Sequence, residues 1–154
     1  MCLTHRFLFS FGFMPAFERT YTDLDVAIDD LRCVLQRTSA DGSVAPPASV
    51  SDDVLEYTRM VLHEWLANLV QHASFAAADP WVEVHVEFSD RHVFCTIADN
   101  SDGFDLTRQL DLQEQAPPPF PERGMGLRII RACTETVSYA PRDDGLQHFT
   151  CTIP

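Results

Sequence analysis

The segment LHEWLANLVQHASF carries three polar side chains on one side of an expected helix. Glu64, Asn68 and His72 follow one another at intervals of four residues, so they form a single stripe on a helix. The carboxylate could act as a general base, and the amide oxygen could coordinate a hard cation such as magnesium. A solvated helix face gives the same pattern. The stripe alone therefore leaves both interpretations open.

The segment IADNSDGFD places another acidic group at the end of an expected strand. Asp99 ends that strand, and Gly103 lies in the turn that follows. A carboxylate at a strand end can accept a hydrogen bond from an exocyclic amine of a ligand. A plain acidic turn is the simpler interpretation, because Asp, Asn, Ser and Gly are common turn residues.

The segment ERGMGLRII opens another expected helix with two glycines. Gly124 and Gly126 would let backbone amides approach an anion, and the helix N-terminus adds partial positive charge. Arg123 and Arg128 could add phosphate contacts. A GxG pair by itself is also typical of an ordinary loop end.

Hydrophobic periodicity indicates helices and strands that are interspersed along the chain. The expected helices cover residues 23–37, 51–75, 106–112 and 126–134. The expected strands cover residues 16–22, 81–88, 92–99, 135–140 and 148–154. On the long helix the apolar face is formed by Leu55, Leu62, Leu66, Leu69 and Ala73, with Trp65 at its edge. Because two strand pairs are arranged as hairpins, we expect an α/β (α+β) two-layer sandwich with a mixed, largely antiparallel sheet.

Length and charge limit the classes of protein that this chain can belong to. At 154 residues with 45% hydrophobic content it can bury one sizeable core, which favours one domain. A net charge of -12 argues against binding nucleic acid or anionic membranes. The five cysteines are far apart and form no CxxC pair, so neither a zinc site nor a disulfide framework is indicated, and a cytoplasmic location is expected.

The N-terminal segment MCLTHRFLFSFGFMPAF is considered apart from the domain. Residues 1–15 are interpreted as an extension, either an extra strand or an over-extended start with Met14 as the true beginning, and residues 16–154 as a single domain. His5 and Arg6 before a short apolar run are similar to a signal peptide, but no small-residue cleavage site is clear. The run is also too short to span a bilayer.

The order and spacing of the three polar segments resemble a known set of motifs. ExxxNxxxH on a helix, a strand ending in a DxxxG turn, and GxGL opening a helix are similar to the N, G1 and G2 boxes of the GHKL ATPase superfamily. Within it, the small size and the segments DNSDGFD and RGMGLRIIRACTETVSY most resemble the RsbW-type anti-sigma-factor serine kinases, over about residues 17–154. The resemblance implies the Bergerat ATP-binding fold, with ATP and Mg2+ as cofactors.

The resemblance also implies roles for individual residues. Glu64 would be the general base, and Asn68 would coordinate the magnesium on the ATP phosphates. Asp99 would bind the adenine amino group, and Gly103 would leave room for the base. The other nucleotide-binding positions that it implies are His72, Arg123, Gly124, Gly126 and Leu127.

One position departs from the family pattern. The G1 box usually reads DxGxG, and here its first glycine is Ser101. If that position needed a positive φ, a serine would be strained, and if it lay over the adenine, its side chain would narrow the pocket. The proline-rich segment from Asp105 to Arg123 would be the lid, whose only cations are Arg108 and Arg123.

The function that the resemblance implies is an Mg-ATP-binding serine/threonine protein kinase that acts as an anti-sigma factor. Its partners would be a STAS-type anti-sigma-factor antagonist, which it phosphorylates, and a sigma factor, which it sequesters; the family also implies a homodimer. One alternative is a nucleotide-binding regulatory module that acts only by sequestration. Ser101 favours this alternative and the retained Glu64 argues against it. The other is an unrelated α/β domain with coincidental boxes.

Overall fold

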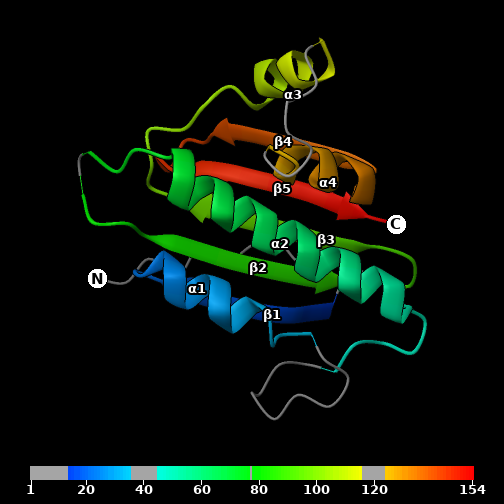
Figure 1. The fold of residues 1–154 in the computed structure, drawn as a ribbon. Helices are drawn as coiled ribbons and strands as arrows, with labels where there is room; N and C mark the ends of the chain where they lie inside the picture. The colour runs from blue at the N-terminus through cyan, green and yellow to red at the C-terminus, as the bar shows by residue number, and fades with distance from the viewer. Residues whose placement is uncertain (1–13, 36–44, 77, 116–123) are drawn as a thin grey trace.

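The protein folds as an antiparallel sheet with helices on one face (Figure 1). The computed structural model describes residues 14–35, 45–76, 78–115 and 124–154. Its elements in chain order are β1 (Met14–Tyr21), α1 (Leu24–Leu31), α2 (Asp52–His72), β2 (Val82–Phe88), β3 (Val93–Asp99), α3 (Leu106–Gln115), α4 (Gly126–Cys133), β4 (Thr136–Pro141) and β5 (Gln147–Ile153). The strand order is β1-β2-β3-β5-β4. The expected α/β sandwich is confirmed, although every strand pairing in the described part is antiparallel where a mixed sheet was expected.

The long helix α2 crosses the sheet and carries most of the helical side of the core. It begins after Ser51, whose hydroxyl accepts the Val54 amide at 3.3 Å, as an N-cap does. Its buried side chains are those of Leu55, Thr58, Val61, Leu62, Trp65, Leu66 and Leu69. The predicted apolar face is therefore confirmed for its four leucines, Trp65 lies fully within it, and Ala73 follows the end of the helix and is half-buried.

The strands follow the predicted alternation between a buried and a more exposed face. On β2 the buried residues alternate with half-buried ones, so Val84 and Val86 face the core while His85 does not. On β3 and β5 the facing pairs include Ile97 opposite Phe149, both fully buried. In the described part of the chain no helix is long and apolar enough to cross a membrane.

Several element boundaries differ from the sequence prediction, among them the start of β1, at Met14 instead of residue 16, and the end of α2, at His72 instead of residue 75. Helix α1 ends at Leu31 instead of residue 37, because the chain turns to bury Val34 and Leu35 completely. Leu35 has a φ of 62°, a left-handed conformation that no other non-glycine residue in the described ranges adopts. Helix α3 is longer than expected. Most of the expected N-terminal extension, much of the loop after α1 and the prolines of the lid lie outside the described residues.

Candidate functional site

The N-terminal end of α4 lies directly against the polar stripe of α2. A Cβ placed on Gly126 would be 2.9 Å from Glu64 Oε2, 3.4 Å from Asn68 Nδ2 and 3.6 Å from Asn68 Oδ1. Glu64 and Asn68, from the segment that resembles an N box, therefore lie beside Gly126, from the segment that resembles a G2 box, and their roles in catalysis and nucleotide binding stay predictions. A residue with a side chain at position 126 would displace the Glu64 carboxylate from the place it occupies beside α4.

The first turn of α4 provides backbone donors at this point. Its N-cap residue, Met125, makes no side-chain capping hydrogen bond, and no acidic residue lies in the first turn. Such a helix start has amide groups without intrahelical partners and a partial positive charge, which together favour an anion. Beside it, Asn68 Nδ2 is buried and has no hydrogen-bond partner among the described residues. A carboxylate, an unsatisfied amide and an uncapped helix start thus converge.

The predicted base-binding carboxylate, Asp99, is fully buried and already hydrogen-bonded. Its Oδ1 accepts the Ser101 amide at 3.0 Å and the Ser101 hydroxyl at 2.5 Å. The Tyr139 hydroxyl donates to Asp99 Oδ2 at 3.0 Å and lies 3.2 Å from Oδ1. Burial raises the pKa of Asp99, and these hydrogen bonds from Ser101 and Tyr139 oppose that rise.

The turn after β3 is fixed by hydrogen bonds on both sides. The Asn100 side chain accepts the Trp81 amide at 2.8 Å and donates to the Asp79 carbonyl at 2.9 Å. The Asp102 amide donates to the Ser74 carbonyl, beyond the end of α2, at 2.9 Å. Neighbouring elements therefore hold the turn, and with it Asp99, in place.

The serine in the G1 box is unstrained and serves the carboxylate next to it. Ser101 is not among the residues with positive φ, so the strain considered from the sequence does not arise. Its hydroxyl binds Asp99 and accepts the Gly103 amide at 3.2 Å. Gly103 itself has a φ of 71°, a conformation that favours glycine, and a Cβ there would lie 2.6 Å from Gln147 Cδ, so it would displace the end of that side chain.

Four aromatic rings fill the core beside Asp99. Trp65 stacks on Phe149 with ring centroids 4.0 Å apart, and it meets Tyr139 edge-on at 4.7 Å. Phe104 lies 5.6 Å from Trp65 and 5.0 Å from Tyr139. Tyr139 therefore extends from this aromatic cluster to Asp99.

The other predicted positions differ in where the structure places them. His72 is the last residue of α2 and is exposed, so its supporting role stays a prediction. Gly124 is exposed, with a φ of 77° and open space around it. Leu127 is buried in the hydrophobic core, where it holds α4. Arg123 lies outside the described residues.

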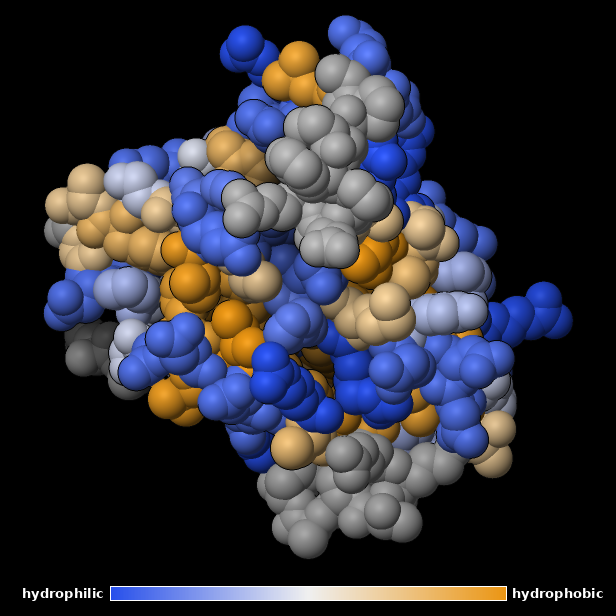
Figure 2. Space-filling model, viewed as in Figure 1, coloured by the Kyte–Doolittle hydropathy of each residue, from blue (hydrophilic) through white to orange (hydrophobic). Residues whose placement is uncertain are grey.

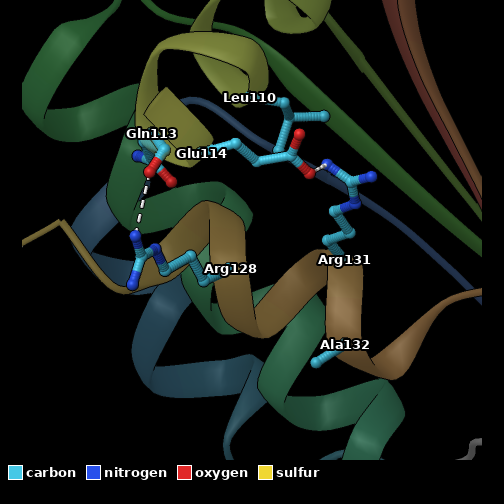
Figure 3. Close-up of a pocket in the computed structure, with 6 residues that line it drawn as sticks. All are labelled: Leu110, Gln113, Glu114, Arg128, Arg131 and Ala132. Atoms are coloured by element: carbon cyan, nitrogen blue, oxygen red, sulfur yellow. Dashed lines mark hydrogen bonds and ion pairs between the residues drawn. The ribbon is translucent and has the colours of Figure 1, made fainter. Parts of the chain in front are cut away.

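Two arginines of α4 contact α3 instead of the candidate site. Arg128, a possible phosphate contact in the sequence, donates to the Gln113 carbonyl of α3 at 2.9 Å. Arg131 forms an ion pair with Glu114. Figure 3 shows both side chains reaching from α4 toward α3, around a cavity of about 280 Å³ that Leu110 also lines.

A separate groove lies on the helix-covered side. It has a volume of about 320 Å³ and is lined by residues of the α1 start and the α2 end, including Leu24, Leu69 and Phe75. Figure 2 shows hydrophobic residues gathered in this region between α1 and the end of α2. Neither this groove nor the cavity at α3 is lined by Glu64 or Asn68.

The two ends of the candidate site fit Mg-ATP to different degrees. At the phosphate end, the space beside Gly126 and the unsatisfied Asn68 Nδ2, a hydrogen-bond donor, fit a phosphate oxygen, and the amide oxygen Oδ1 is the atom of Asn68 that could coordinate a metal. Within the described ranges, no group of three or more His, Cys, Asp or Glu side chains could hold a metal ion. At the end where the resemblance places the adenine base, the fit is poorer, because Ser101 and Tyr139 are hydrogen-bonded to Asp99 and cover it.

The fold and site together define an α/β domain in which a helix start without a side-chain cap lies beside a carboxylate and an amide. The family model of the histidine kinase-like ATPase domain matches residues 26–148, most of the chain, and the chain belongs to this family. Membership implies ATP binding, for which Mg2+ is a typical companion. The GHKL-type family is therefore confirmed, and the RsbW type stays a prediction. No curated protein matches the chain.

Sequence reasoning missed the residues that surround Asp99. Tyr139 comes from β4, forty residues further along the chain, and only the alternation of that strand points to its inward orientation. Gln147 is the residue of β5 paired with Asp99, so its place against Gly103 depends on the strand register. Neither residue belongs to one of the three motifs.

Proposed function

We propose that this chain is an Mg-ATP-dependent serine/threonine protein kinase. The observation that carries the proposal is the contact of Gly126 with Glu64 and Asn68, where a potential base, a metal-binding amide and an uncapped helix start converge. Phosphoryl transfer depends mainly on positioning and charge stabilisation, which such an arrangement can provide.

Each group has a definite task in this reaction. Glu64 takes the proton of the acceptor hydroxyl while the new oxygen–phosphorus bond forms and the bond to ADP breaks. Asn68 holds the metal, which neutralises charge on the phosphates when bound. The amides at the start of α4, beginning at Gly126, bind phosphate oxygens.

The acceptor and the partners are proposed from the resemblance to the RsbW-type kinases. The acceptor is a serine or threonine on a STAS-type anti-sigma-factor antagonist. The chain also binds a sigma factor and acts as a homodimer. A sequestering module without kinase activity is the second candidate, and the burial of Asp99 beneath Ser101 and Tyr139 favours it.

Labelled ATP and a purified STAS-domain protein separate these candidates, because only a kinase transfers label to the partner. We expect Glu64→Gln to bind Mg-ATP but to transfer label about 100- to 10,000-fold more slowly. Asn68→Ala should lose the stabilisation of about 2.7 kcal/mol expected when Mg-ATP is present at a hundred times its Kd. Glu56→Gln is the matched control, because Glu56 lies on the same helix but pairs with Arg59 at the surface.

Three outcomes are decisive. Transfer by Glu64→Gln at the wild-type rate would exclude Glu64 as the base. Normal Mg-ATP binding by Asn68→Ala would exclude Asn68 as the metal ligand. Binding of Mg-ATP and a sigma factor by the wild type, without label on any partner, would favour the sequestering module.

A further inference from the structure

The hydrogen-bonding capacity of Asp99 is largely taken up within the protein. Its Oδ1 receives the amide and the hydroxyl of Ser101, and its Oδ2 receives the Tyr139 hydroxyl at 3.0 Å. The side chain is 0% exposed. A ligand amino group therefore cannot reach this carboxylate until one of these groups moves.

Tyr139 is the partner that can leave most readily. Ser101 is two residues from Asp99 in a turn that Asn100 and Asp102 hold to neighbouring elements, so its amide and hydroxyl stay with the carboxylate. Tyr139 comes instead from β4, which is the last strand in the sheet order and pairs with β5 on one side. Its phenol also donates to Asp99 the kind of hydrogen bond that an exocyclic amine would donate.

We propose that Tyr139 is an affinity- and specificity-determining residue whose hydroxyl competes with the 6-amino group of a purine nucleotide for Asp99. This inference rests on the proposed nucleotide site. In the free protein Tyr139 satisfies the buried carboxylate, and on binding it withdraws as the amino group replaces it. A base without that amino group cannot compensate Asp99 for the loss of the phenol.

Tyr139→Phe tests this competition, with ATP and ITP as probes. The two nucleotides carry the same phosphates, but ITP has a carbonyl oxygen in place of the 6-amino group. Because a hydrogen bond to a charged group has to be broken in the wild type only, the variant should bind Mg-ATP about 10- to 100-fold more tightly. Mg-ITP lacks the amino group that displaces the phenol and binds with Tyr139 in place, so its affinity should be unchanged. Tyr57→Phe, an exposed tyrosine on α2, is the matched control and should change neither affinity.

Trp65 provides a second measurement that does not depend on the Tyr139 variant. Its ring is 4.7 Å from that of Tyr139, and Trp81 is the other tryptophan of the chain. In a Trp81→Phe background, saturating Mg-ATP should change the Trp65 emission as Tyr139 withdraws. An unchanged emission on saturation would overturn the proposal.

The binding outcomes distinguish this inference from the proposed function. Equal or weaker ATP binding by Tyr139→Phe, or an equal gain for ITP, would overturn the competition while leaving the nucleotide site intact. Failure of both the wild type and the variant to bind either nucleotide would overturn the site itself, and the role of Tyr139 with it.

Discussion

The contact between Gly126 and Glu64 can be tested by adding one methyl group. In Gly126→Ala the new Cβ would lie 2.9 Å from Glu64 Oε2, closer than such atoms essentially ever approach. Because the carboxylate is the end of a flexible side chain, we expect it to move while the two helices keep their positions. Asn68 Nδ2, at 3.4 Å, needs to shift by only a few tenths of an ångström.

The effects on stability and on activity should differ sharply. Alanine favours a helix over glycine by about 0.5–1 kcal/mol, and less at its first position. Displacing the Glu64 side chain costs about 0.5–1.5 kcal/mol if it leaves a preferred rotamer. The free energy of unfolding of Gly126→Ala should therefore stay within about 1 kcal/mol of the wild type. Phosphotransfer should fall about 100-fold, because misplacing a reacting group by about 1 Å has that effect.

Chemical denaturation and transfer of labelled phosphate under saturating Mg-ATP measure the two effects. Glu64→Ala removes the clashing carboxylate, so Gly126→Ala should be more favourable for stability in that background than in the wild type. A double-mutant cycle gives this coupling free energy directly. If Gly126→Ala keeps the wild-type transfer rate and shows no coupling with Glu64→Ala, the reasoning about this contact is wrong.

Three further predictions concern stability. Gly103→Ala should lower the free energy of unfolding more than Gly145→Ala, because both glycines have positive φ but an added Cβ at Gly103 would also displace the Gln147 side chain; urea denaturation compares the two variants. The pKa of Asp99 is raised above 3.8 in the folded protein, so its contribution to stability is present at low pH and is lost as the pH rises through the folded pKa. As the pH rises from acidic to neutral, the free energy of unfolding of Asp99→Asn should therefore increase relative to that of the wild type. A difference between the two proteins that does not change with pH would contradict this. Trp65→Ala should lower the free energy of unfolding by about 3–5 kcal/mol. Val70→Ala, at an exposed site of the same helix, should lower it by less than about 0.5 kcal/mol. Similar losses in the two variants would contradict the burial of Trp65.

The sequence predicted the elements well where a repeating pattern made local structure and burial agree. Strand β2 followed its periodicity to within one residue, and helix α2 did so except at its C-terminal end, which is His72 instead of residue 75. Helix α1 was predicted too long because the pattern continues through Val34 and Leu35, which are buried from a turn instead of a helix. A hydrophobic pattern indicates which residues are buried, and a residue can be buried from a helix or from a turn.

The sequence by itself determined which groups of α2 share a face, because helical geometry places Glu64 and Asn68 one turn apart. It also determined where glycines occur. Only the tertiary structure decided that Gly126 meets those two side chains, since that contact depends on how α4 packs against α2. The strand order likewise brought Tyr139 to Asp99. Contacts between distant segments depend on packing and register, which no local spacing encodes.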